Sequence, residues 1–149
     1  MLRGSCDGFT PSDFHRLCDN KGPTVTVIKV QNTGQLIGGY TPSSWSSNSN
    51  RGWESVDDNF IFSLGKEMGD QMIQSKQKSG YACGVYCAPG YGPIFGLGND
   101  LKLDGTNFQT NSKCYSKQKS YQLPIMNGAE NRRVNFSVEE YEVFQVIEK

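Results

Sequence analysis

Short runs of alternating apolar and polar residues, separated by turn residues, dominate the chain. The most regular run covers residues 24–30, where valine, threonine and isoleucine fill almost every position, and β-branched side chains favour strands. The turn residues that follow, up to Gly34, predict a hairpin whose second strand ends near Tyr40. Gly38 and Gly39 in that second strand indicate a bulge, a sharp bend or the close approach of another segment.

Further strands are expected wherever short apolar runs lie between turn residues. Their expected ranges are 2–6, 59–64, 81–87, 91–98, 101–103, 134–136 and 140–147. In the second of these ranges, phenylalanine and leucine alternate with isoleucine and serine, which predicts at least one fully buried face. The polar segments 41–58, 65–80 and 104–120 are expected to form loops, the first of them anchored by Trp45 and Trp53.

One helix is predicted between residues 10 and 18. Thr10 is a suitable N-cap, and Asp13 occupies the acid position of a capping box. Apolar residues at helical spacing predict that this helix packs on a sheet. Gly22 and Pro23 then stop the helix and lead into the next strand. Many strands with one clear helix predict an α+β fold, with antiparallel sheets packed as a β-sandwich.

Length and composition are those of one β-rich domain. The 149 residues are enough for a single hydrophobic core. Hydrophobic residues make up 36% of the chain and aromatic residues 11%, which argues against a disordered chain or a coiled coil. The formal net charge is zero, so neither nucleic acid nor an anionic membrane is an expected partner. Because no membrane-spanning run or signal peptide is evident, we expect a soluble, intracellular, monomeric domain.

Cysteine usage argues for free thiols. The five cysteines are Cys6, Cys18, Cys83, Cys87 and Cys114. An odd number with irregular spacing makes a poor disulfide framework. Cys83 and Cys87 would lie about 13 Å apart along a strand, too far to share one metal ion, and the chain has a single histidine. We therefore expect no metal site.

Candidate catalytic groups gather near the N-terminus. Ser5, Asp7 and His15 have the residue types of a hydrolytic triad, but closeness in sequence does not establish triad geometry, and no Gly-x-Ser-x-Gly motif is present. Cys18 or Cys6 with His15 would instead supply a thiolate pair, although helical cysteines are usually packing residues. The glycines in residues 91–98 do not follow the dinucleotide-binding pattern. We expect no catalytic residue and no cofactor.

The acidic C-terminal strand carries the candidate partner-binding or buried acids, Glu139, Glu140 and Glu142. Glu142 shares a strand face with Phe144. In a buried face, Glu142 would require an ion pair or hydrogen bonds. On an exposed face, the same acids would attract a basic partner, and the sequence leaves both alternatives open.

Several blocks of residues together resemble one known family. The chain contains Asp7-Gly8-Phe9, Cys18-Asp19-Asn20-Lys21-Gly22-Pro23-Thr24 and Ile37-Gly38-Gly39-Tyr40. It also contains Phe60-Ile61-Phe62-Ser63-Leu64, a Gly-Pro-Ile-Phe-Gly segment that ends at Gly96 and is followed by Asp100-Leu101, and the closing Tyr141-Glu142-Val143-Phe144. In kind and order these blocks resemble the TLDc domain over essentially the whole chain. The motif positions expected to be structural are Asp7, Gly8, Gly22, Pro23, Gly38, Gly39 and Gly96.

The resemblance implies a two-sheet antiparallel β-sandwich with flanking helices, and a single domain over residues 1–149 of the kind found in larger eukaryotic proteins. Members of this family are linked to protection against oxidative damage, and several bind the vacuolar proton pump (V-ATPase) and regulate its assembly. We therefore expect a non-enzymatic protein-interaction domain that binds V-ATPase subunits. The alternatives are a thiol-based antioxidant enzyme that uses an exposed cysteine and a structural module of a multidomain protein.

Overall fold

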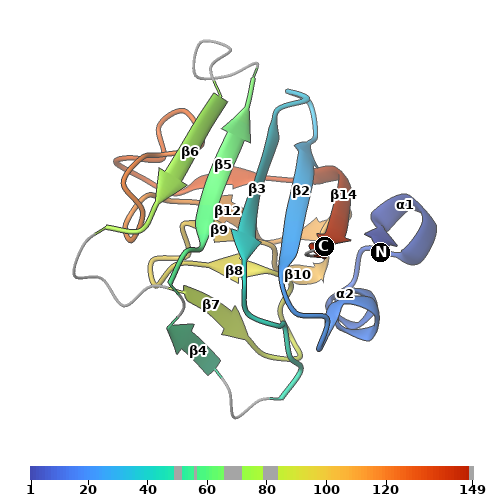
Figure 1. Cartoon of the computed structure of the whole chain (residues 1–149). Coiled ribbons are helices and arrows are strands. Elements are labelled where there is room, and N and C mark those ends of the chain that lie inside the picture. Colours follow the sequence, from blue (N-terminus) through green and yellow to red (C-terminus); the bar gives the residue numbers. More distant parts are fainter. Residues whose placement is uncertain (49–51, 56, 66–71, 79–83, 148–149) are drawn as a thin grey trace.

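The protein is a β-sandwich of two antiparallel sheets, seen in a computed structural model that describes residues 1–48, 52–55, 57–65, 72–78 and 84–147 (Figure 1). The first sheet has the order β1 (Leu2–Arg3), β14 (Val138–Gln145), β2 (Thr24–Val30), β3 (Leu36–Thr41), β5 (Phe60–Leu64) and β6 (Met72–Lys76). The second has the order β13 (Val134–Phe136), β12 (Cys114–Ser116), β9 (Leu101–Lys102), β8 (Ile94–Phe95), β7 (Gly84–Cys87) and β4 (Gly52–Ser55). A small hairpin pairs β10 (Gly105–Asn107) with β11 (Asn111–Ser112). The predicted fold class is confirmed.

The predicted hairpin lies at the centre of the first sheet. β2 pairs with β3 from Thr24 opposite Thr41 to Lys29 opposite Leu36, without a shift in register. β14 then pairs along the other edge of β2, so the last strand of the chain lies between the two-residue strand β1 and the hairpin.

The core fills the space between the two sheets. Ile28 and Val143 of the first sheet and Phe95 of the second are fully buried. Trp45 is also fully buried: its ring lies 5.5 Å from that of Phe95, and its Nε1 donates a hydrogen bond to Thr24 Oγ1 at 3.0 Å. The expected anchoring role of Trp45 is thus confirmed, while the side chain of Trp53 lies outside the described part of the structure.

Helix α2 (Pro11–Cys18) forms as predicted. The Thr10 hydroxyl accepts a hydrogen bond from the backbone N–H of Asp13, and the Asp13 carboxylate accepts one from the N–H of Thr10, which completes the capping box. The Thr10 hydroxyl also donates to Asp13 Oδ2 at 2.7 Å, and this bond lowers the pKa of Asp13. Phe14 and Cys18 are buried, so the apolar side of the helix packs on the sandwich.

The expected strand over residues 2–6 is wrong beyond Arg3. The chain turns into the short helix α1 (Gly4–Asp7), which is closed by a hydrogen bond from the N–H of Gly8 to the carbonyl of Gly4 at 2.8 Å. The Asp7 carboxylate also accepts a hydrogen bond from the N–H of Arg3 at 2.8 Å. This local side-chain bond competes with strand pairing. Both helices therefore lie at one side of the sandwich, next to β14 and β2 (Figure 1).

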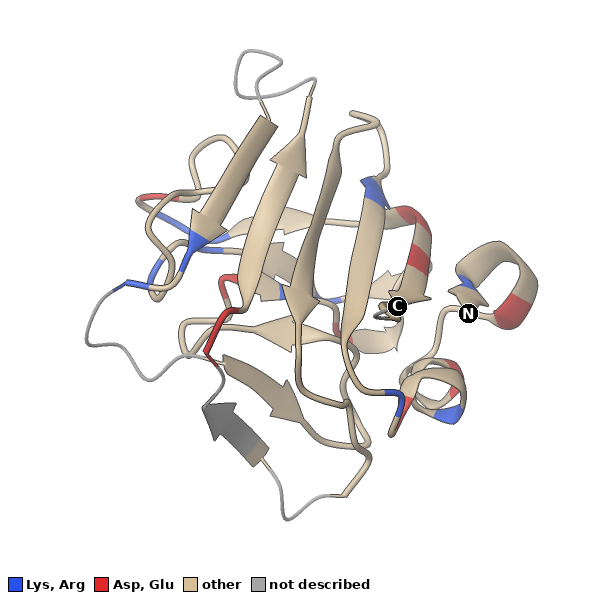
Figure 2. Cartoon of the chain, in the orientation of Figure 1, with Lys and Arg blue, Asp and Glu red and all other residues tan. Residues whose placement is uncertain are grey.

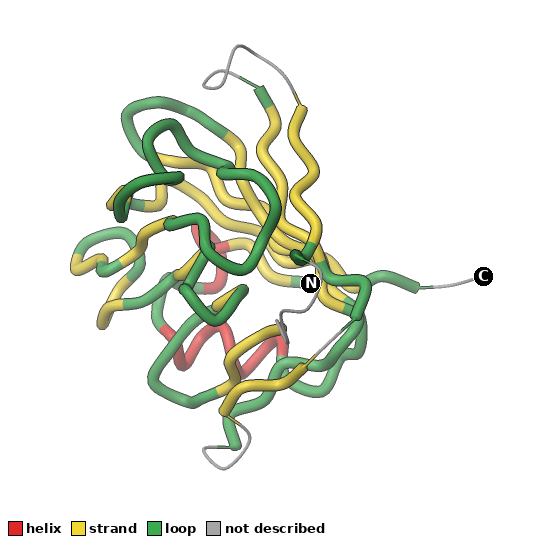
Figure 3. Tube along the Cα trace, turned by 90° about the vertical axis from the view of Figure 1, so that its left-hand side faces the viewer, coloured by secondary structure: helices red, strands yellow, loops and turns green. Residues whose placement is uncertain are grey.

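The three segments expected to be loops contain strands. β4 lies in residues 41–58, β6 in 65–80, and β10, β11 and β12 in 104–120. By contrast, the expected strand at 91–98 is reduced to β8, because a turn follows it in which Gly96 has φ 89° and the N–H of Asn99 bonds to the Gly96 carbonyl. Figure 3 shows that long loops make up much of the layer that contains the second sheet.

No helix among the described residues is long and apolar enough to cross a membrane.

Candidate functional site

The outer face of the first sheet is mostly apolar. The strand registers place Phe144, Val25, Tyr40 and Phe60 in one row across four strands, because residues paired across antiparallel strands point to the same side. This row and its two neighbours also carry Lys29, Gln74, Lys76 and Glu142. Their apolar members form the surface that we call the apolar face. It consists of Val25, Val27, Leu36, Tyr40, Phe60, Phe62, Leu64, Met72 and Phe144.

These side chains are partly or largely accessible. The relative exposure is 79% for Met72 and 46% for Phe144, and the others are partly buried against one another. The rings of Tyr40 and Phe60 lie 5.3 Å apart, and those of Phe60 and Phe62 lie 6.4 Å apart. In Figure 1 this face looks toward the viewer and neither of the described helices covers it, and in Figure 2 the ribbons of β3 and β5 carry no charged residue.

The aromatic residues of β5 form the outward side of that strand. Ile61 and Ser63 are buried between the sheets, whereas Phe60, Phe62 and Leu64 point outward. The predicted buried face is therefore confirmed, but it is the face with the smaller side chains. Hydrophobicity alone does not distinguish the two sides of a strand when both carry apolar residues.

Gly38 and Gly39 let aromatic rings approach the sheet from opposite sides. A Cβ atom at Gly38 would collide with the Phe62 ring on the apolar face and with the Thr26 carbonyl oxygen. A Cβ at Gly39 would lie 2.6 Å from the ring of Phe95 in the core. The register is regular at both positions, so the glycines mark close packing and not a bulge.

The three candidate glutamates lie at the β14 side of the apolar face, and each has a partner. Glu142 Oε1 lies 2.8 Å from Arg3 Nε, and Glu139 Oε2 lies 2.7 Å from Lys29 Nζ. Glu140 Oε1 accepts a hydrogen bond from the N–H of Ser5 at 2.9 Å. These side chains remain accessible to solvent, and exposed ion pairs contribute only about 0–1 kcal/mol each.

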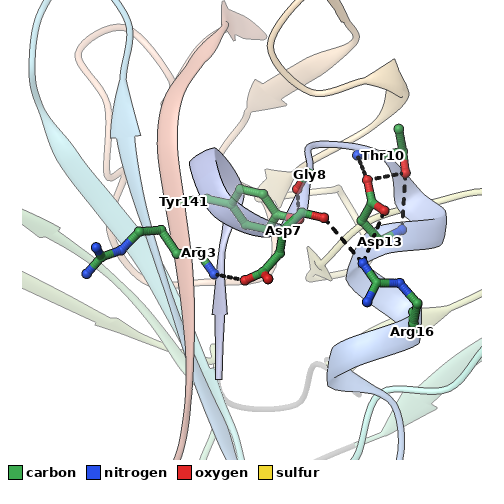
Figure 4. Close-up of polar contacts among 7 residues, drawn as sticks. All are labelled: Arg3, Asp7, Gly8, Thr10, Asp13, Arg16 and Tyr141. Atoms are coloured by element: carbon green, nitrogen blue, oxygen red, sulfur yellow. Dashed lines mark hydrogen bonds and ion pairs between the residues drawn. The ribbon is translucent and has the colours of Figure 1, made fainter.

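Asp7 and Gly8 join both helices to β14 (Figure 4). The Tyr141 hydroxyl donates a hydrogen bond to the Gly8 carbonyl at 3.1 Å, and Arg16 Nη2 donates to the Asp7 carbonyl at 3.3 Å. Burial raises the pKa of Tyr141, so its hydroxyl keeps its proton and remains a donor. This turn therefore fixes the N-terminal segment on the sandwich.

The family model of the TLDc domain matches residues 3–147, which include the N-terminal turn, the apolar face and the closing strand β14. The chain belongs to the TLDc domain family. A search of curated proteins finds no match.

Two other motif positions of the TLDc domain make hydrogen bonds at the start of β2. The N–H of Gly22 donates to Ser44 Oγ at 2.8 Å, and the carbonyl of Pro23 accepts a hydrogen bond from the N–H of Val146 at 2.9 Å. These two bonds tie the start of β2 to the segment after β3 and to the end of β14. Gly22 and Pro23 thus position the central hairpin.

Gly96 makes room for the carboxylate of a buried acid, Asp100. That carboxylate accepts hydrogen bonds from the backbone N–H groups of Lys119, Ser120 and Tyr121, at 2.8 to 3.1 Å. Burial raises the pKa of Asp100, and these backbone bonds act in the opposite direction. The sequence gives no separate signal for this clamp, because its donors are backbone groups of a distant loop.

In the TLDc domain, the hydrogen bonds of His15 do not go to Ser5 or Asp7, the other two candidate triad residues. His15 is buried, its Nδ1 lies 2.7 Å from Asp19 Oδ1, and its Nε2 lies 2.8 Å from the carbonyl oxygen of Tyr91. Both ring nitrogens therefore face acceptors other than Ser5 and Asp7. The imidazole connects α2 to the loop before β8.

The cysteines of the TLDc domain differ in burial. Cys18, Cys87 and Cys114 are buried, Cys6 is exposed, and Cys83 lies outside the described residues. Burial raises the pKa of Cys18 to about 12 and also raises that of Cys114. No group of three His, Cys, Asp or Glu side chains in the described part of the chain is placed to hold a metal ion.

Proposed function

We propose that this TLDc domain is a non-enzymatic protein-binding module and that the apolar face is its docking surface. The observation that carries the proposal is the side-by-side placement of nine apolar side chains on a sheet face that neither of the described helices covers. Large apolar patches on a protein surface usually mark interaction sites. Aromatic residues and methionine, which predominate on this face, are also enriched in protein interfaces.

The partner that we propose is the V-ATPase, within a response to oxidative stress. Support comes from membership of the TLDc family, which the sequence resemblance links to binding of this pump and to protection against oxidative damage. In this proposal the domain acts inside the cell as a monomer, peripheral to the membrane that holds the pump. The paired glutamates at the rim contribute to orientation more than to affinity, because rim charges mainly steer association.

The test is a binding assay with purified V-ATPase and the variants Met72→Asp and Phe144→Asp. Both side chains are accessible and lie on the apolar face, so a charge there disrupts an interface with little effect on the fold. Each variant is expected to weaken binding by about tenfold or more. The matched control is Leu97→Asp, because Leu97 is 42% exposed and lies in the turn after β8.

The two parts of the proposal fail in different ways. If the folded wild-type domain does not bind the pump, the assignment of the partner is overturned. If the pump binds and Leu97→Asp weakens binding as much as Phe144→Asp, the apolar face is not the docking surface. Circular dichroism of each variant checks that the fold is retained.

A further inference from the structure

A cleft of about 740 Å³ opens where the β2–β3 turn meets the second sheet, and its lining mixes polar and apolar residues. Its walls come from the β2–β3 turn of the first sheet and from β12, β13 and the end of β9 in the second. The volume falls within the range of sites that bind small molecules.

The cleft carries positive charge although the whole chain is neutral. Lys102, Lys113 and Arg133 line it, and Asp104 is the single carboxylate among its described lining residues. Asp104 Oδ2 lies 3.2 Å from Lys102 Nζ, so this acid is already paired. Within the described chain, Lys113 and Arg133 have no ion-pair partner, which leaves an excess of two positive charges facing the cleft.

Tyr115 holds the cations in place. The Arg133 guanidinium lies 4.1 Å from the centroid of the Tyr115 ring, and Lys102 Nζ lies 5.3 Å from the same centroid. The ring is itself fixed, because Tyr115 is 7% exposed and its hydroxyl accepts a hydrogen bond from Asn99 Nδ2 at 2.7 Å. Stacking on an aromatic ring restrains the planar guanidinium while its N–H groups stay available for an anion.

The strand register places the side-chain amide of Asn135 next to these cations. Tyr115 is paired with Lys102 on one side and with Asn135 on the other, so all three side chains point to the same face of the second sheet. Asn135 also lines the cleft, and its side chain supplies N–H donors. The lining therefore combines two kinds of cation with a neutral donor around one space.

We propose that this cleft binds a small molecule that carries a phosphate group. A phosphate concentrates a charge of about −1.5 to −2 on one compact group with three acceptor oxygens, which matches the local excess of two positive charges. The fork of Arg133 is suited to bidentate contact with two of those oxygens, and Lys113 adds a point charge. Neither the apolar face nor the proposed protein partner takes part in this site.

The test is a titration of the whole domain with inorganic pyrophosphate. Binding is measured by isothermal titration calorimetry and by the chemical shifts of the backbone amides in NMR spectra. Binding is expected, with shifts concentrated at residues 102, 113–115 and 133–135. Arg133→Ala is expected to weaken binding by about tenfold or more, since it removes a charge-assisted bidentate contact. Binding is also expected to weaken as salt concentration rises.

The matched control is Arg132→Ala, which removes the same charge from an exposed neighbour that does not line the cleft. Thermal melting confirms that both variants fold. The proposal is overturned if pyrophosphate does not bind the folded domain, or if Arg132→Ala weakens binding as much as Arg133→Ala. Citrate is the comparison probe: binding as tight as that of pyrophosphate would overturn the assignment to phosphate.

Discussion

Burial divides the cysteines of the TLDc domain into two kinds. Cys18, Cys87 and Cys114 fill space in the core, and Cys6 lies on the exposed side of helix α1. Reaction with peroxide or an alkylating agent requires an accessible thiolate. Chemistry based on thiols would therefore have to begin at Cys6, among the cysteines that the structure describes.

We predict that, of the four cysteines whose burial the structure describes, only Cys6 reacts in the native domain. The experiment is alkylation with iodoacetamide and mass spectrometry, carried out on a Cys83→Ser background so that only described cysteines are counted. One adduct is expected, at Cys6, and none is expected in the additional Cys6→Ser variant. Rapid modification of Cys18 in the folded protein would contradict the burial and the raised pKa of this thiol.

The role of a single residue could be predicted from the sequence only where its partner lies nearby in the chain. Thr10 and Asp13 have a local role, and the capping box was predicted correctly because both partners lie within one turn. Asp100 could not be assigned, because its hydrogen-bond donors lie some 20 positions further along the chain. The partner of Glu142 is Arg3, at the other end of the sequence, and only the pairing of β1 with β14 brings them together.

At the scale of elements, strands with strong composition were predictable and weakly patterned strands were not. β2 is almost wholly β-branched, and its pairing with β3 follows from the turn between them. β6 contains Gln74 and Lys76 on its accessible side and forms an edge of the first sheet. Strand pairing with β5 determines its conformation, so its own residues give little signal.

Gly39→Ala is predicted to destabilise the domain by about 1–3 kcal/mol, because an added methyl group would overpack the core against the ring of Phe95. The measurement is urea unfolding at neutral pH. Gly90→Ala is the control, since no atom other than those of its chain neighbours lies within 4 Å of the position that its Cβ would take. Equal stability of the Gly39→Ala variant and the wild type would show that the β3 backbone can move away from the second sheet.

At the scale of the whole molecule, the apolar face depends on the registers of five strands. Phe60 and Ile61 are both strongly apolar, and nothing within β5 tells which of them faces the core. In the assembled sheet, Ile61 is buried between the two sheets and Phe60 aligns with Tyr40 on the outer face. The β-sandwich was therefore predictable from the sequence, whereas the docking surface required the assembled sheet.

The stability of the whole fold is predicted to fall as the pH rises from about 9 to about 12. The unfolded thiol of Cys18 ionises near its ordinary pKa of 9.0, whereas in the folded domain it stays protonated until about 12. The unfolded state therefore binds fewer protons in this interval, and one such group lowers the free energy of unfolding by about 1.4 kcal/mol per pH unit. Tyr141, whose pKa is also raised by burial, acts in the same direction at higher pH.

The measurement is urea unfolding at a series of alkaline pH values for the wild type and for Cys18→Ala. The variant is expected to be less stable at neutral pH, because it leaves a small cavity, but to show a shallower decline above pH 9. Parallel curves for the two proteins would show that Cys18 does not contribute to the alkaline transition.

The place of β14 in the first sheet has a consequence for the order of events during protein synthesis. This strand pairs along the whole of β2, with Gln145 opposite Thr24 and Val138 opposite Val30. During synthesis, β2 is therefore made early, but it can pair with β14 only after nearly all of the domain has been made. Pairings this distant in sequence slow folding and leave edges open in the meantime. Until β14 leaves the ribosome, one side of the β2–β3 hairpin has no neighbour, and a nascent chain at that stage is a natural client for chaperones.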